Sequence, residues 1–214
     1  MVVQERQVLT DFRRKLDEKI GRRKLLVENK NSISLELVKY QTEHENCLKA
    51  RTIVQTVARS TQESIEIHIG NITTLALATV FPDPYTFSLR FIERRNTTEA
   101  DLIFTKNGNE TDDILNTGGG GVADIASFAL RIALWSLKKT RATFLLDEPD
   151  KFLHSPVYQE KASALMKDLC EKLGIQILLI SDQQRIIAAA DKVIRIENKN
   201  GVSEVSEVNN VSQN

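Results

Sequence analysis

The first 79 residues contain no proline and only two glycines, Gly21 and Gly70, so little in them opposes a helix. Apolar residues recur there at steps of three and four, with dense charges between them. This spacing predicts a long helical arm over residues 1–79, with a break near residues 29–32, where Asn and Ser gather. The apolar stripe is narrow, which favours a coiled-coil seam over a face buried in a globular core.

The composition changes near residue 80. Two prolines within FPDPY, residues 81–85, should end the helix. Residues 86–95 then alternate apolar and polar side chains as a strand does, and residues 100–108 form a second such run. We expect these two runs to form an antiparallel hairpin.

From residue 117 the pattern becomes α/β. Glycines 118–121 lead into an apolar helical stretch, and the apolar runs 143–147 and 175–181 alternate with an amphipathic helix that Gly174 should cap. Such alternation predicts a parallel sheet covered by helices on both faces. A short helix and a hairpin with an Asn-Gly turn should close the lobe. We therefore expect an α/β lobe over residues 80–205 and a loose tail over residues 206–214.

The charge balance narrows the classes of partner. The formal net charge is zero, so nucleic-acid binding would need a local patch. Residues 11–30 carry eight Lys and Arg against four acids, which fits either a solvated coiled-coil face or contacts with the phosphates of double-stranded DNA. The two cysteines form no C-x-x-C pair, and no apolar run reaches the roughly 20 residues that span a bilayer. These features predict a cytoplasmic protein without a membrane anchor.

An acidic pair follows the first apolar strand, in TFLLDEP at residues 143–149. A strand in a parallel sheet would deliver Asp147 and Glu148 to the carboxyl edge, where open α/β sheets bind ligands. The first carboxylate could hold Mg²⁺ and the second could polarise a water for attack on a phosphate. An acidic pair in this place also serves in many proteins simply to cap the next loop.

Two further segments point to the same edge. Glycines 118–121 would let backbone N–H groups approach an anion at a helix N-terminus, although a run of four glycines also occurs in flexible linkers. Ser181 and Asp182 end the second apolar strand and would lie beside the same ligand. Asp182 is equally suited to be the N-cap of the short helix that follows.

In this order the segments resemble the C-terminal lobe of the ABC-type ATPase heads of SMC proteins and their double-strand-break-repair relatives, in a small phage or bacterial form. GGGGVADIASFALRIAL resembles the signature motif and its helix, which implies nucleotide contacts from Gly119, Gly120 and Gly121. FLLDEP resembles the Walker B motif, which implies that Asp147 holds Mg²⁺ and Glu148 is the catalytic base. Residues 151–154 resemble the D-loop, and Asp182 stands where the family has its catalytic switch histidine.

The departures from the family pattern bear on activity. The chain has no G-x-x-x-x-G-K-[ST] phosphate loop, which the family carries in its N-terminal lobe. Gly119 occupies the signature serine position, with Thr117 as the nearest substitute hydroxyl, and Val122 replaces a polar residue. Asp182 in place of histidine would repel a γ-phosphate. The arm also lacks the C-x-x-C of a zinc hook.

The resemblance implies the C-terminal half of a split ATPase acting in DNA repair or recombination. Such a chain would use ATP and Mg²⁺ only in an oligomer completed by a protein with the Walker A lobe, with a repair nuclease as a further partner. The alternative is a non-catalytic protein of the same fold that binds a related ATPase head or DNA. A coiled-coil adaptor with an incidental α/β cap would leave the order of the three motifs unexplained.

Overall fold

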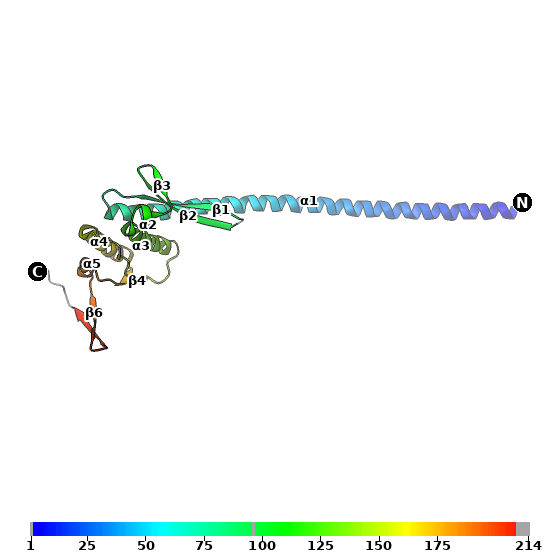
Figure 1. Cartoon of the computed structure of the whole chain (residues 1–214). Helices are drawn as coiled ribbons and strands as arrows, with labels where there is room; N and C mark the ends of the chain where they lie inside the picture. The colour runs from blue at the N-terminus through cyan, green and yellow to red at the C-terminus, as the bar shows by residue number, and fades with distance from the viewer. Residues whose placement is uncertain (1, 96, 209–214) are drawn as a thin grey trace. The chain divides into compact units, whose positions relative to one another are not determined.

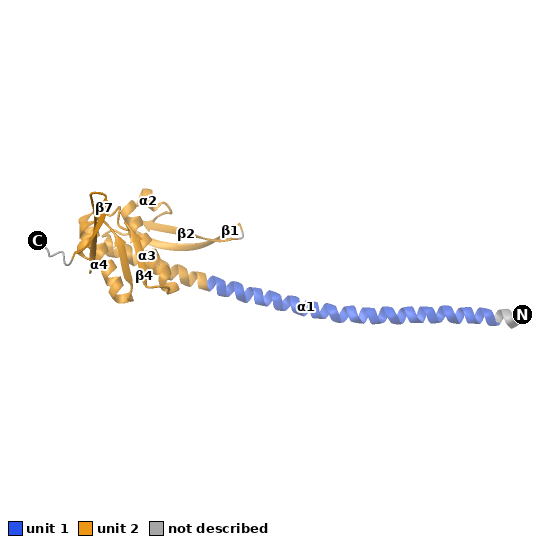
Figure 2. Ribbon diagram, turned by 90° about the horizontal axis from the view of Figure 1, so that it is seen from below, with its two compact units in different colours: residues 1–60 blue, residues 61–214 orange. Residues whose placement is uncertain are grey.

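The computed structural model describes residues 2–95 and 97–208, and its chain folds into two compact units, residues 1–60 and 61–214 (Figures 1 and 2). The helices are α1 (Val2–Val80), α2 (Ile114–Thr117), α3 (Gly120–Leu137), α4 (Pro156–Leu173) and α5 (Gln184–Ala188). The strands are β1 (Thr86–Arg94), β2 (Thr97–Lys106), β3 (Asn109–Thr111), β4 (Thr143–Asp147), β5 (Gln176–Ile180), β6 (Val193–Lys199) and β7 (Val202–Val208).

Helix α1 is continuous, so the predicted break at residues 29–32 is wrong. Asn and Ser lower helix propensity by less than about 0.7 kcal/mol each, far less than a proline would. The hydroxyl of Ser34 also donates to the carbonyl of Lys30 at 2.8 Å, which keeps it within the helix. The expected boundary near residue 80 marks the end of this helix, whereas the chain divides into units at residue 60.

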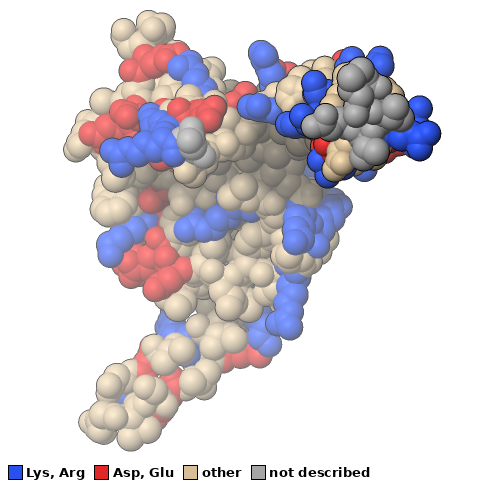
Figure 3. All heavy atoms as spheres, turned by 90° about the vertical axis from the view of Figure 1, so that its right-hand side faces the viewer, with Lys and Arg blue, Asp and Glu red and all other residues tan. Residues whose placement is uncertain are grey.

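In the first unit, the side chains described from residue 6 to residue 60 are all exposed. They include apolar side chains of the predicted stripe such as Phe12, 65% exposed, and Leu16, 47% exposed. Lysine and arginine side chains surround the end of α1 that faces the viewer in Figure 3. The side chains of residues 6–60 therefore form no core of their own.

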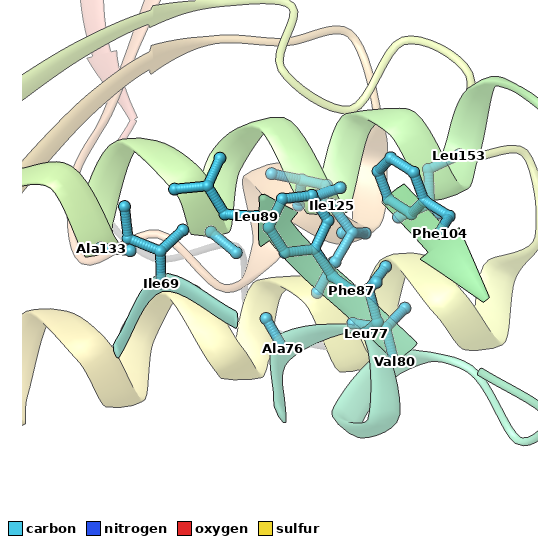
Figure 4. Packing of buried hydrophobic residues seen from close by; sticks show 14 residues of the cluster. Ile69, Ala76, Leu77, Val80, Phe87, Leu89, Phe104, Ile125, Ala133 and Leu153 are labelled. Carbon is cyan, nitrogen blue, oxygen red and sulfur yellow. The ribbon is translucent and has the colours of Figure 1, made fainter. Parts of the chain in front are cut away.

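In the second unit, the main core forms between the last turns of α1, strand β1 and helix α3. Leu77 and Val80 of α1 are fully buried, and they meet Phe87 of β1 and Ile125 of α3 in one cluster (Figure 4). The apolar end of α1 thus supplies a wall of the core. Leu153, in the loop after β4, belongs to the same cluster and ties that loop to the core.

Strands β1, β2 and β3 form an antiparallel sheet, which confirms the predicted hairpin and adds a short third strand. Helix α1 covers the outer edge of β1. Thr74 Oγ1 accepts the N–H of Phe87 at 2.9 Å, and Glu66 accepts the N–H of Phe91 at 2.6 Å. Gly70 permits this approach, because a Cβ there would lie 3.3 Å from the carbonyl oxygen of Phe87.

Strands β4 and β5 pair in parallel, as predicted, but they form a sheet of two strands. Its inner face packs on α3 and α4 through a second cluster that includes Phe128, Leu146 and Met166. Its outer face is bare: Leu145 is 77% exposed and Ile180 is 67% exposed. The prediction of a sheet covered on both faces is therefore wrong, because the described residues supply helices to one face only.

The remaining predictions concern the helices and the end of the chain. Gly174 caps α4 in the left-handed conformation (φ 63°), as predicted, and β6 and β7 form the closing hairpin around Asn200 and Gly201. Strand β7 reaches Val208, so residues 206–208 are not a loose tail, and residues 209–214 lie outside the described residues. Helix α3 is long and apolar enough to cross a bilayer, but its buried face belongs to both core clusters.

Candidate functional site

The acidic pair stands at the carboxyl end of the parallel sheet. Asp147 is the last residue of β4 and pairs with Ile180 of β5, and the N–H of Glu148 extends the ladder to the carbonyl of Ile180 at 2.9 Å. Both acids are exposed. The Glu148 carboxylate forms an ion pair with Lys151 Nζ at 2.9 Å. This edge forms because the two short apolar strands β4 and β5 pair in parallel and bury the same face against α3 and α4.

Asp182 follows β5 at the same edge and is exposed. It does not cap the next helix, because the N-cap of α5 is Gln183. Burial is the main cause that raises the pKa of the Asp150 carboxyl, and the nearby charges of Asp182 and Glu148 add to the rise. The structure thus brings Asp147, Glu148 and Asp182 to one edge of the sheet.

Asp150 is a residue of this edge that the sequence analysis did not single out. Its side chain is buried, 1% exposed, and burial is the main cause that raises the pKa of its carboxyl. Ser181 Oγ donates to Asp150 Oδ2 at 2.9 Å, which partly offsets that rise. In the sequence Asp150 is merely a third acid close after Asp147 and Glu148, and nothing there indicates that its side chain is buried.

The glycine run begins helix α3, and its members have different tasks. Gly119 has φ 85° and ψ 164°, a conformation that side chains other than glycine rarely adopt. A Cβ on Gly120 would lie 2.5 Å from Cβ of Phe152, and one on Gly121 would lie 3.2 Å from the Phe152 carbonyl oxygen. These two glycines are therefore required where the loop after β4 packs against the start of α3.

A carboxylate strengthens this contact. Asp124, in the second turn of α3, accepts the backbone N–H of Phe152 at 2.8 Å. Burial is the main cause that raises the pKa of this carboxyl, and the bond from Phe152 lowers it. The sequence indicated no contact between Asp124 and Phe152, because a linear pattern does not show that these two segments meet.

Thr117 lies in α2, ahead of the glycine run. Its hydroxyl donates to the carbonyl of Asp113 at 2.6 Å, within its own helical turn, and its carbonyl accepts the hydroxyl of Tyr85 at 3.2 Å. A pocket of about 330 Å³ borders it, with Tyr85, Lys106 and Tyr158 among its lining residues. To contact a ligand at Gly119, the Thr117 hydroxyl would have to leave its bond to Asp113.

The chemistry of the edge suits a partly hydrated cation and a reacting water. Among residues 2–95 and 97–208, no three His, Cys, Asp or Glu side chains gather as a metal cage. Mg²⁺ is commonly held by one or two carboxylates together with water and substrate phosphates, and an exposed Asp147 fits that role. The free N-terminus of α3, opened by Gly119, suits an anion.

Solved structures share this fold. A structure titled "Structural biochemistry of ATP-driven dimerization and DNA stimulated activation of SMC ATPases" matches with TM-score 0.54 and 18% identity, over 71% of this chain and 89% of that one. An SMC head bound to the C-winged helix domain of ScpA matches with TM-score 0.53 and 21% identity, over 72% of this chain. The Smc head of Pyrococcus yayanosii, with a coiled coil and joint, matches with TM-score 0.55 and 19% identity, over 74%.

The chain has an SMC-head-like, ABC-ATPase-type fold. It spans 45% of the ScpA-bound head and 29% of the Pyrococcus yayanosii structure, so much of each of those chains has no counterpart here. No family model matches the sequence. No curated protein matches it either.

Proposed function

We propose that this chain is the C-terminal half of a split SMC-like ATPase that acts in DNA repair or recombination. It supplies the Walker B acids and the signature glycines to an ATP-dependent pair of heads. A separate polypeptide with a Walker A lobe completes each head. A repair nuclease and double-stranded DNA are its further partners.

The observation that carries the proposal is the bare outer face of the β4–β5 sheet. Three apolar side chains are exposed on it: Leu145 at 77%, Leu178 at 49% and Ile180 at 67%. Two parallel strands with one open face and open edges seldom occur alone, because parallel sheets are normally buried on both sides. Asp147 and Glu148 stand at the end of this unfinished sheet. A second lobe that covers the face would also close the site around them.

The position of the acids at the sheet edge and of the glycines at the start of α3 supports the following roles. Asp147 holds Mg²⁺ through an oxygen at the open end of β4, and Mg²⁺, when bound, offsets the negative charge of the phosphates. Glu148 accepts a proton from the attacking water. Gly119, Gly120 and Gly121 present the N-terminus of α3 to a nucleotide held by the opposite head. Asp182 lies beside the reacting groups, and Thr117 lies next to the glycines.

A second function is favoured by three observations. Gly119 offers no signature hydroxyl, Asp182 places a carboxylate where a phosphate would come, and Lys151 already engages Glu148. These features suit a non-catalytic protein that uses the same bare face to bind a related ATPase head. The two functions differ in turnover and share the docking face.

Affinity capture of the tagged chain from its native source, with and without ATP and Mg²⁺, tests the proposal. The split ATPase requires a co-purifying protein that carries G-x-x-x-x-G-K-[ST]. In that complex, Glu148→Gln should lower ATP turnover by about 100-fold or more and preserve ATP-dependent association. Glu171→Gln makes the same chemical change on the exposed side of α4 and should leave turnover unchanged.

The outcomes separate the two functions. Turnover that survives Glu148→Gln contradicts the catalytic role. A complex that binds but shows no turnover in the wild type supports the non-catalytic protein. Capture without any protein that carries a phosphate loop contradicts both forms of the docking proposal.

A further inference from the structure

A hydrogen-bonded tie joins the loops that follow β4 and β5. Ser181 Oγ donates to Asp150 Oδ2 at 2.9 Å and accepts the N–H of Gln183 at 3.1 Å. Just before these residues in both segments, the N–H of Glu148 donates to the carbonyl of Ile180 at 2.9 Å. The Asp150–Ser181 bond therefore acts as one more rung beyond the end of the β4–β5 ladder, made by side chains instead of backbone.

This rung borders a backbone conformation that needs support. Glu148 has φ 41°, in the left-handed region that residues other than glycine and asparagine rarely occupy. Such a residue costs about 1–3 kcal/mol and persists only where its surroundings fix it. The bonds around Glu148 do so from both sides: its N–H is held by Ile180, and its carbonyl accepts the N–H of Lys151 at 3.3 Å.

The loop beyond Glu148 is fixed in the same way. The carbonyl of Asp150 accepts the N–H of Leu153 at 3.0 Å. Gln159 Nε2 donates both to the carbonyl of Leu153 at 2.7 Å and to Gln183 Oε1 at 2.6 Å. These hydrogen bonds form a closed circuit. It runs from Asp150 through Ser181, Gln183 and Gln159 to Leu153, whose N–H returns it to Asp150.

The choice of a carboxylate in this circuit is costly. Asp150 is 1% exposed, and in the described part of the chain it has no Lys or Arg ion pair. A buried charge of this kind is expensive unless hydrogen bonds repay it. An apolar side chain would fill the same space more cheaply, so packing alone does not account for Asp150.

We propose that Asp150 and Ser181 are positioning residues: their bond holds the loop after β4 in the conformation that directs the Glu148 carboxylate. The effect on turnover rests on the proposed function, whereas the effect on the loop does not. Ser181 follows β5 directly, so its bond to Asp150 fixes the loop after β4, and with it Glu148, relative to the end of β5. When the tie is removed, Glu148 leaves its left-handed conformation and its carboxylate is no longer held at the sheet edge.

Hydrogen exchange of the full-length chain, without any partner, tests the tie itself. Ser181→Ala should raise the exchange rates of the backbone amides of Glu148, Lys151 and Leu153 by about tenfold, because a bond to a charged acceptor is lost. Ser181→Thr keeps the hydroxyl and should restore slow exchange. Ser163→Ala is the control, since the Ser163 hydroxyl bonds only to Glu160 of its own helix in the described structure. Exchange that is equal in Ser181→Ala and the wild type overturns the proposal.

Turnover of the completed complex tests the consequence. Ser181→Ala should lower kcat about tenfold with little change in KM, because a general base acts in the chemical step rather than in binding. A kcat that stays at the wild-type value, in a complex that Glu148→Gln inactivates, overturns the positioning role. A complex in which Glu148→Gln has no effect contradicts the proposed function instead, and the exchange experiment still decides whether the tie holds the loop.

Discussion

The two main sheets of the second unit both pack an apolar face against helices, yet they differ in what they leave exposed. The β1–β2–β3 sheet buries one face within this chain: Phe87 is 4% exposed, and α1 bonds to the outer edge of β1 through Glu66 and Thr74. The β4–β5 sheet has Leu145 at 77% exposed on a face that nothing in the described chain covers. The first sheet is therefore packed within this chain, and the second keeps an exposed apolar face.

This difference separates buried residues that stabilise the fold from exposed apolar residues that are available for an interaction. A large exposed apolar patch on one face of a sheet marks an interaction site. The same patch carries the acids Asp147 and Glu148 at its end, so docking and chemistry would be coupled at one edge. The predictions below test that distinction, from the largest expected effect to the smallest.

The largest effect should come from charging the bare face. Leu145→Glu together with Ile180→Glu should weaken association with the proposed Walker A partner by about 10,000-fold or more, because two charges would be buried without partners. Thermal unfolding of the chain alone should change little. Co-purification and titration of the partner measure the loss. Leu134→Glu, at an exposed position of α3, is the matched control, and equal losses in both variants would contradict a docking role for this face.

Truncating an apolar side chain should lower the free energy of unfolding much more in the first sheet than on the outer face of the second. Phe87→Ala should lower the free energy of unfolding by about 3–5 kcal/mol, since it empties a filled core position. Leu145→Ala should change it by less than about 0.5 kcal/mol, as exposed substitutions do. Urea denaturation of the two variants makes the comparison. Similar losses would mean that the outer face of β4–β5 is covered within the chain.

The hydrogen bonds between α1 and the edge of β1 should contribute less to the free energy of unfolding than the core position of Phe87. Glu66→Ala removes a charged acceptor from the N–H of Phe91 and should cost about 1.5–3 kcal/mol. Glu45→Ala, on the exposed part of the same helix, should cost less than about 0.5 kcal/mol. Denaturation curves measure both values. A Glu66→Ala variant as stable as Glu45→Ala would show that α1 does not secure this edge.

The smallest effect concerns the acids at the end of β4–β5. Burial raises the pKa of Asp150 above its ordinary value of 3.8, so the folded state binds this proton more tightly than the unfolded state. Folding stability should therefore decline as pH rises from that value through the raised pKa. Asp150→Asn carries no such proton, and its stability relative to the wild type should rise over the same interval. A difference that stays constant with pH, in denaturation at several pH values, would contradict the shift.

Much of the fold could be predicted because it depends on local chemistry. The absence of proline predicted the helix, FPDPY its end, and Gly174 and Asn200–Gly201 a cap and a turn. The break at residues 29–32 was wrong because weak propensities do not interrupt a helix that keeps its hydrogen bonds. The cover of the sheet was wrong because alternation of strands and helices does not tell how many faces one chain can cover.

The sequence by itself determined the elements, their order and the acids and glycines at their ends, since backbone conformation and apolar period are set by neighbouring residues. Only the tertiary structure decided which of these residues meet. Gly120 and Gly121 face Phe152, Asp124 holds the Phe152 amide, and Asp150 joins Ser181. These contacts link segments distant in the chain, and they depend on how the core brings α3, β4 and β5 together, which no local pattern encodes.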